Sequence, residues 1–251
     1  MVAGGHPRWK SSSGIERFNP ETRLSDSFSK AMTGVLAVCA ISLTILAIHR
    51  ELTAKAVSAD GPRTGIEAAP LARETWKTLI EGGHRRGPVA SPVTIVVFTD
   101  FECPACRRLA LSGLRGVVER FEGEVAVVYR HWPLPYHRFA MPAARAVECA
   151  HAQGNFDRFA DLLFEKQDSL GLKSFESYAS DAGVADSARF AACAHSSTPV
   201  PAIEHDRVLP SRIGAEGTPT LIVNGVLIRG VPDSARLDSI IIAANRKSSL
   251  R

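Results

Sequence analysis

One short stretch, residues 93–107, restricts the fold of this chain more than any other. It begins with the apolar, mostly β-branched run Val93–Phe98, which predicts a buried strand. Cys103 and Cys106 follow after a brief turn, and apolar residues then recur at the spacing of a helix. Pro104 suits the first turn of that helix, because its missing N–H would have no partner there. The sequence therefore places two cysteines where a buried strand passes into a helix.

This position predicts redox chemistry for the two cysteines. Free N–H groups and the positive end of the helix dipole stabilise a thiolate at Cys103, so its pKa falls and it becomes the attacking sulfur. Cys106 lies one turn later on the same face, within reach to form or resolve a disulfide. Two cysteines at this spacing also make half of a zinc site, and spacing alone leaves that alternative open.

Two stretches of the chain look like motifs of a known family. Phe98-Thr-Asp-Phe-Glu-Cys-Pro-Ala-Cys106 resembles the active-site signature of the DsbA-like thioredoxin-fold oxidoreductases. Gly217-Thr-Pro-Thr-Leu-Ile-Val-Asn-Gly225 is similar to the threonine and cis-proline of that family, followed by a strand and a hairpin. The resemblance covers roughly residues 76–244. It implies an α/β thioredoxin-like fold with a helical insertion, and thiol–disulfide exchange as the activity.

The resemblance also implies which residues form the site. Cys103 and Cys106 correspond to the catalytic pair of the family. The positions that support them are Pro104, Ala105, Thr218 and Pro219. A cis Thr218–Pro219 bond would face Cys103 and present backbone to an extended polypeptide, which permits strand-like pairing with a substrate.

Two departures from the family leave the direction of the reaction open. Ala105 stands where the strongly oxidising members carry a histidine that donates to the thiolate, so we expect Cys103 to be less acidic than in those members. Val97 stands where many thioredoxin-fold enzymes have a buried carboxylate; Asp100 and Glu102 are expected to cap the turn or face solvent. We favour an oxidase, with a reductase or isomerase that uses the same residues as the alternative.

Cys149 and Cys193 flank the region predicted to be helical. Related DsbA-like proteins often carry a structural disulfide, so the resemblance implies that these two cysteines pair. Spacing does not prove it, because the Cα atoms must lie within about 7 Å of each other. Two separate buried thiols are the alternative.

An uncharged apolar run, Ala31–Ile48, precedes the linker. As a helix it would extend about 27 Å, enough for the hydrocarbon of a bilayer. We interpret residues 31–49 as a single transmembrane signal anchor, with a buried core helix as the alternative; cleavage after Val57-Ser-Ala59 stays open. An oxidising dithiol belongs outside the cytosol, so the catalytic domain is expected in the periplasm or at the cell exterior.

The rest of the chain divides by composition and periodicity. Residues 1–30 form a polar tail, residues 50–87 a linker or stem with a short helix, and residues 88–247 the DsbA-like domain, with its helical insertion at about 138–198. Later strands are predicted at 125–130, 221–223 and 226–229. Helices are predicted at 140–153, 156–169, 175–182, 186–195, 203–213 and 237–245.

Charge and motif content exclude several function classes. The net charge is +4 and no basic run interleaves with aromatic residues, so nucleic-acid binding is not indicated. No phosphate-binding loop is evident, and no cofactor is expected. No metal site is expected either, because the histidines at 131, 137, 151 and 205 show no ligand spacing.

The partners expected are therefore thiol-bearing protein substrates and a membrane redox partner. A monomer is the default, because no long heptad repeat is present. A different class of function also fits the two cysteines: a non-catalytic metal-binding or chaperone-like module of the same fold.

Overall fold

The computed structural model describes residues 32, 41–45 and 70–250. The chain divides into two compact units, Met1–Thr64 and Gly65–Arg251. In the first unit, residues 41–45 are helical. The predicted polar tail and most of the predicted transmembrane anchor lie outside the described residues. Within the described part of the chain, no helix combines the length and the apolar character that a membrane span requires.

The second unit is built on a mixed five-stranded sheet with the order β1-β3-β2-β4-β5. The two central strands, β2 and β3, run parallel, and each outer pairing is antiparallel. Every residue of β2 and β3 is buried, which explains why both strands consist almost entirely of apolar residues. The strands are β1 (His84–Arg86), β2 (Val93–Thr99), β3 (Val125–His131), β4 (Thr220–Val223) and β5 (Val226–Ile228).

A helical connection joins β2 to the parallel strand β3. It consists of α3 (Pro104–Arg108), a π-helical segment η1 (Leu109–Leu114) and α4 (Arg115–Arg120). The predicted strand, turn and helix around the two cysteines are therefore present, in that order.

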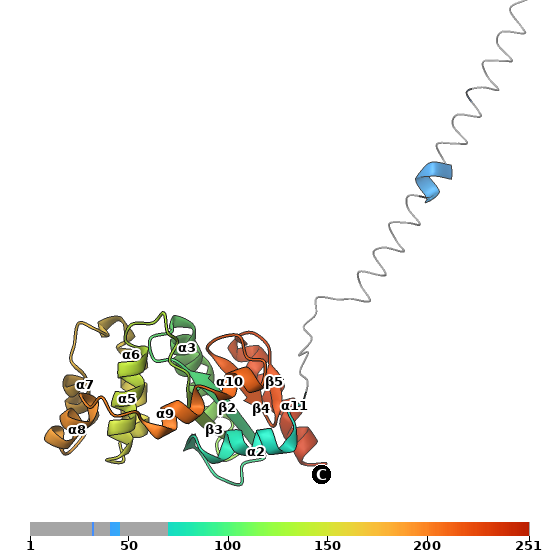
Figure 1. The fold of residues 1–251 in the computed structure, drawn as a ribbon. Helices are drawn as coiled ribbons and strands as arrows, with labels where there is room; N and C mark the ends of the chain where they lie inside the picture. Colours follow the sequence, from blue (N-terminus) through green and yellow to red (C-terminus); the bar gives the residue numbers. More distant parts are fainter. Residues whose placement is uncertain (1–31, 33–40, 46–69, 251) are drawn as a thin grey trace, which may run out of the picture. The chain divides into compact units, whose positions relative to one another are not determined.

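Four helices then form the insertion between β3 and β4, and Figure 1 shows them gathered to one side of the sheet. Two of them begin at caps that are legible in the sequence: the Ser174 side chain accepts from Ser177 N, and the Asp186 side chain accepts from Arg189 N. The elements are α5 (Ala140–His151), α6 (Phe156–Glu165), a short 3₁₀ turn η2 (Gln167–Ser169), α7 (Phe175–Ala182) and α8 (Ser187–Ala194).

The chain returns to the sheet through two helices, α9 (Pro201–Asp206) and α10 (Leu209–Arg212). The prediction of one helix over 203–213 is therefore wrong. Pro210 is the reason: it lacks an N–H, and its ring would clash with the carbonyl four residues earlier, so a new helix has to begin there.

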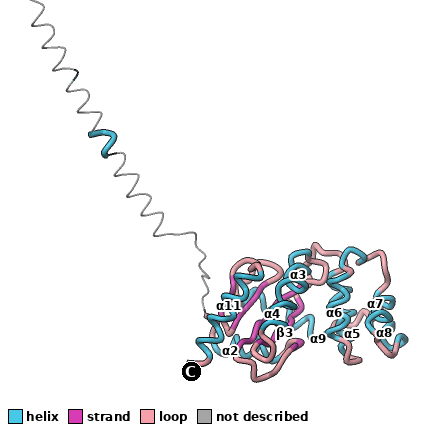
Figure 2. The backbone as a smooth tube through the Cα atoms, turned by 180° about the vertical axis from the view of Figure 1, so that it is seen from behind, coloured by secondary structure: helices cyan, strands magenta, loops and turns pink. Residues whose placement is uncertain are grey.

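A hairpin and a closing helix complete the sheet. Asn224 and Gly225 have φ values of 46° and 83°, as the two-residue turn between β4 and β5 requires. The helix α11 (Ser234–Ser248) begins at Asp233, whose side chain accepts from Arg236 N at 2.8 Å. Figure 2 shows α11 and α4 along the sheet region, away from the α5–α8 block.

The segment predicted to be a linker contributes two elements to this unit. Helix α2 (Arg73–Glu81) buries Leu79 completely, and β1 pairs with β3 at the sheet edge. The compact unit thus includes residues before 88, where the predicted domain begins.

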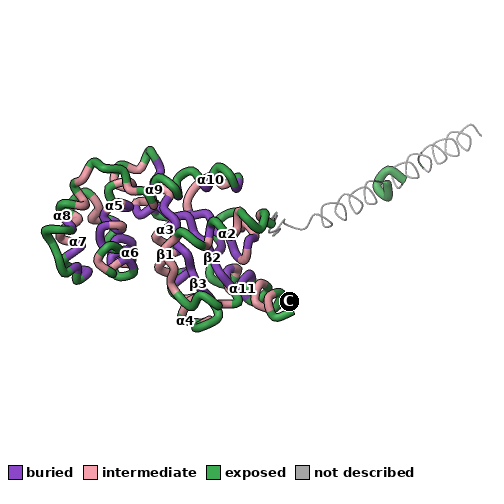
Figure 3. The backbone as a smooth tube through the Cα atoms, turned by 60° about the horizontal axis from the view of Figure 1, so that its bottom comes forward, coloured by how far each residue is buried: buried purple, intermediate pink, exposed green. Residues whose placement is uncertain are grey.

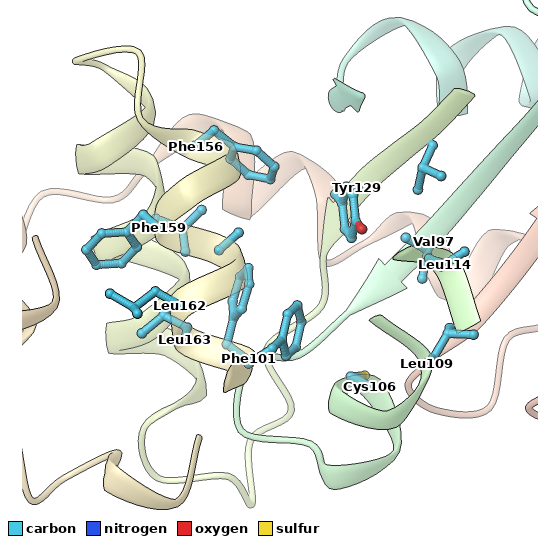
Figure 4. Close-up of a cluster of buried hydrophobic side chains, with 14 of the residues drawn as sticks. Val97, Phe101, Cys106, Leu109, Leu114, Tyr129, Phe156, Phe159, Leu162 and Leu163 are labelled. Atoms are coloured by element: carbon cyan, nitrogen blue, oxygen red, sulfur yellow. The ribbon is translucent and has the colours of Figure 1, made fainter. Parts of the chain in front are cut away.

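Two apolar clusters lie on opposite faces of the sheet. The smaller one joins Val96 and Phe98 of β2 to Leu79 of α2 and Leu209 of α10. The larger one contains Ile95 and Val97 and extends into the helical insertion. Figure 3 shows the buried strands at the centre of the unit. In Figure 4, Phe101 lies between the side chains of α6 and the helix that carries Cys106 and Leu109, so one continuous core joins the sheet to the insertion.

Candidate active site

Cys103 and Cys106 lie at the junction that the sequence predicts. Cys103 is the N-cap residue of α3, with extended backbone (φ −72°, ψ 120°), and Pro104 is the first residue of the helix. Both cysteines are free thiols in this structure, which is therefore the dithiol form of the pair. Both residues are buried, but Cys103 is 6% exposed and Cys106 is 1% exposed, so Cys103 lies nearer to the surface of the two.

The surroundings of Cys103 favour its thiolate. Its pKa falls from the ordinary 9.0 to about 5, chiefly because the Cys106 side chain hydrogen-bonds to its sulfur. Burial opposes this shift, and the backbone N–H groups of Cys106 and Ala105 add to it. Ala105 thus contributes through its backbone where a histidine side chain is missing.

Cys106 is shifted in the opposite direction. Burial raises the pKa of its thiol well above 9.0, and the neighbouring Cys103 thiolate adds to this effect. The Asp100 N–H donates to the Cys106 sulfur at 3.5 Å and opposes it weakly. At neutral pH the pair therefore consists of a stabilised thiolate at Cys103 and a more deeply buried thiol at Cys106, the arrangement of an attacking and a resolving cysteine.

The second sequence motif lies against the first. The Thr218–Pro219 peptide bond is cis, in agreement with the prediction. In its protonated form the Cys103 thiol donates to the Thr218 carbonyl oxygen, with an S···O distance of 3.4 Å. Thr220, the next residue after Pro219, pairs with Phe98 at the end of β2. The register between β4 and β2 therefore carries Thr218 and Pro219 to the attacking sulfur.

Two acidic residues shape the turn before Cys103. Asp100 is buried and accepts hydrogen bonds from Glu102 N, Leu134 N and His137 Nδ1, each at 2.8 Å. Glu102 accepts from Phe139 N through its second carboxylate oxygen. Asp100 therefore caps the turn, as predicted, but it is buried, whereas the Glu102 side chain bonds the N-terminal end of α5 instead of the turn. The burial of Asp100 depends on the 132–139 loop, which no local pattern reveals.

Gln167 is a site residue that the sequence does not indicate. The residue is 8% exposed, and its side-chain amide donates to the carbonyl oxygens of Phe101 at 2.8 Å and Cys103 at 3.1 Å. These two bonds attach the active-site turn to the helical insertion. A glutamine after a helix carries no signal of this role, because its partners are backbone atoms more than 60 positions earlier.

Two further cysteines form a separate pair within the insertion. Cys149 of α5 and Cys193 of α8 are joined by a disulfide, with their Cα atoms 5.8 Å apart. The bond closes a sequence separation of 44 residues and links two helices that already pack on each other. Such a crosslink stabilises chiefly by restricting the unfolded chain.

The pKa of Cys103 leads to a pH prediction. In the reduced protein, alkylation of Cys103 by iodoacetamide should reach half its maximal rate near pH 5, because the thiolate is the reacting species. Since this folded-state pKa lies below that of an unfolded thiol, the reduced protein should also gain stability as the pH rises from about 5 towards 9.0, and lose it as the pH falls through 5.

The matched control for this titration is Cys106→Ala, which removes the largest stabilising contact. Its midpoint should move upward towards 9.0. A wild-type midpoint that already lies near the ordinary thiol value would contradict the geometry described for Cys103.

Comparisons with known proteins agree with this geometry. A family model described as thioredoxin matches residues 79–243. A curated relative, the Na⁺/H⁺ antiporter NhaA 1 of Mycolicibacterium vanbaalenii, is 36% identical over 166 residues. That match covers 65% of this chain but 27% of the antiporter, so the chain spans only a minor part of that relative's length.

Solved structures share the fold at lower identity. BdbD from Bacillus subtilis, in its oxidised form, is 21% identical with a TM-score of 0.61, covering 71% of this chain and 97% of that one. The α-DsbA1 protein of Wolbachia pipientis is 18% identical with a TM-score of 0.61, covering 70% and 98% respectively. The family match spans both the cysteine pair and the cis-proline motif, and the chain therefore belongs to the thioredoxin family.

Proposed function

We propose that this chain is a membrane-anchored, extracytoplasmic oxidoreductase that donates disulfides to protein substrates through Cys103 and Cys106. The observation that carries the proposal is the division of the pair into a stabilised thiolate at Cys103 and a buried thiol at Cys106. A stable Cys103 thiolate is a good leaving group, and a dithiol form stabilised in this way makes the disulfide form a stronger oxidant.

In the donor direction the reaction has two steps. A substrate thiolate attacks the Cys103 sulfur of the Cys103–Cys106 disulfide; the S–S bond breaks, and Cys106 leaves and takes up a proton in its buried position. A second substrate thiolate then attacks the substrate sulfur of the mixed disulfide, and Cys103 leaves as the stabilised thiolate. The substrate is oxidised by two electrons and the enzyme becomes the dithiol, which a membrane redox partner has to reoxidise.

The cis-proline strand supports a polypeptide substrate. Thr218 places a backbone carbonyl 3.4 Å from the attacking sulfur, and Pro219 has no N–H to compete for pairing. An extended segment next to Cys103 would therefore bind through main-chain hydrogen bonds with little dependence on its sequence.

Two observations support the proposed location. The Cys149–Cys193 disulfide is of the kind that persists in oxidising compartments. The uncharged run at 31–48 is long enough, as a helix, to serve as a membrane anchor on the N-terminal side. Labelling with a membrane-impermeant maleimide in intact cells tests the extracytoplasmic location, and Cys103 should react without lysis. Extraction with alkaline carbonate tests the anchor, and the protein should stay with the membrane. Labelling only after lysis would reject the extracytoplasmic location.

The direction of the reaction is tested by the reduction potential of Cys103–Cys106, equilibrated against glutathione in the full chain. A potential near that of DsbA, about −120 mV, supports an oxidase, and one near that of thioredoxin, about −270 mV, supports a reductase. A protein that exchanges no disulfides at all would instead support a non-catalytic module of the same fold.

A further inference from the structure

A second cluster of reactive side chains lies apart from the cysteines, at the edge of the sheet. The register of β1 on β3 pairs His84 with Tyr129, so His84 and His131 lie on the same face as diagonal neighbours. Helix α5 covers that face and brings Glu148 to both imidazoles. No local pattern predicts this cluster, because its members come from three elements that only the fold brings together.

The three side chains converge on a small volume. Glu148 Oε1 lies 2.5 Å from His84 Nε2 and 2.6 Å from His131 Nε2. The candidate ligand atoms of His84, His131 and Glu148 all lie within 4.8 Å of one another. Two imidazole nitrogens and one carboxylate oxygen from rigid elements form a ligand set that zinc takes in proteins.

Neighbouring groups hold these ligands and leave the cluster accessible. The His84 ring stacks on Phe156 of α6, with the ring centroids 4.0 Å apart. His151 lies one turn after Glu148 on α5, and its ring is 4.3 Å from that of His84. His151 is exposed, whereas the His131 side chain is 3% exposed, so the cluster runs from the surface into the interior. His151, at the exposed end of the cluster, is a candidate fourth ligand.

We propose that His84, His131 and Glu148 bind one divalent cation of the zinc class, with His151 or water in the fourth position. Imidazole nitrogen favours zinc and its transition-metal neighbours over calcium or magnesium. Tetrahedral zinc with bonds of about 2.0–2.1 Å separates its ligand atoms by roughly 3.3 Å, so the two short contacts would open by less than about 1 Å. The ion would fasten the β1–β3 edge to α5.

A hydrogen-bonded cluster is the competing account of the same contacts. It requires both Nε2 atoms to carry protons and to share one oxygen. Within the described residues, His131 Nδ1 is buried without a hydrogen-bond partner, so only Glu148 itself would hold the proton on His131 Nε2. A cation on His131 Nε2 moves the ring proton to Nδ1, which has no acceptor among the described residues, so the metal titration decides between the two accounts.

The experiment uses the full chain with the Cys103–Cys106 disulfide closed, so that thiolates do not compete for metal. Zn²⁺ is titrated against a chromophoric chelator, and bound metal is counted after gel filtration. Wild type should retain one equivalent of Zn²⁺, and Zn²⁺ should raise its melting temperature. Co²⁺ bound in its place should show no sulfur-to-cobalt charge-transfer band.

The test variant is His84→Gln, and the matched control is His195→Gln, which removes a histidine that also bonds a glutamate but lies exposed at the end of α8. The affinity for Zn²⁺ should fall by at least about 10-fold in His84→Gln and stay unchanged in His195→Gln.

Failure of wild type to retain zinc, equal affinity in His84→Gln, or a sulfur band with Co²⁺ would overturn the proposal. If His84→Gln is misfolded by circular dichroism, Glu148→Gln replaces it. None of these readouts depends on disulfide exchange, so the metal site and the redox function can fail separately.

Discussion

Replacing Cys103 with serine is expected to lower the rate at which the protein oxidises a dithiol peptide by about 10³-fold or more, to the background rate. A serine hydroxyl neither forms a disulfide nor leaves as a stable anion, so both steps of exchange are lost. The substitution is nearly isosteric and its site is not fully enclosed, so the fold should persist. The measurement is the rate of peptide oxidation, followed by fluorescence or mass, with oxidised wild type as the reference.

Two variants show whether this loss belongs to the proposed chemistry. Cys106→Ser keeps the attacking thiolate but removes the resolving thiol. The reduced variant should therefore attack oxidised glutathione, release one glutathione thiolate and keep the other half as a stable mixed disulfide on Cys103. Cys39→Ser removes a cysteine outside the predicted site and should exchange at the wild-type rate. Activity retained in Cys103→Ser, or a mixed disulfide on another cysteine, would contradict the assignment of Cys103.

The attacking half of the site was predictable because its signals are local. A buried strand, a turn and a helix start follow one another within the 93–107 stretch, so the position of Cys103 at an N-cap comes from hydrophobic pattern and Pro104 alone. The cis-proline needed a family resemblance in addition, because a proline at the start of a strand has no isomer signature of its own. What joined the two motifs was the register of β4 on β2, which is a property of the whole sheet.

The parts that sequence reasoning missed depend on long-range pairing. The strand β1 reads His-Arg-Arg, which has no apolar alternation, and it is a strand only because β3 offers a free edge. Asp100 is buried because the Leu134 N–H and the His137 ring of a distant loop bond its carboxylate, and Gln167 is buried because it donates to two carbonyls of the active-site turn. Buried polar side chains need hydrogen-bond partners, and here the partners are distant in the sequence, so no local sequence pattern indicates them.

The same limit applies to an ion pair in the smaller of the two cores. Arg130 of β3 is fully buried, and its guanidinium donates to Asp206 Oδ1 at 2.6 Å and to the carbonyl oxygens of Thr78 and Leu79. Asp206, at the end of α9, also accepts from the His131 N–H at 2.9 Å. One carboxylate thus connects β3 and α9, while the guanidinium reaches α2.

Asp206→Asn is expected to destabilise the protein by about 3 to 5 kcal/mol, because it leaves the Arg130 charge buried without a counter-charge. The amide is close in size to the carboxylate, so little of this loss should come from a cavity. Urea unfolding with the Cys149–Cys193 disulfide intact measures it, as a lower midpoint with an unchanged m-value.

Glu204→Gln provides the matched control on the same helix. Glu204 pairs with Arg207 at 3.4 Å, but both side chains are 47% exposed, so its removal should change stability by less than about 0.5 kcal/mol. The double variant Arg130→Met/Asp206→Leu removes both charges and should recover much of the loss, since an apolar pair of similar volume carries no desolvation penalty. If Asp206→Asn loses no more stability than Glu204→Gln, water reaches the Arg130 guanidinium, and the pair does not act as a buried ionic link between β3, α9 and α2.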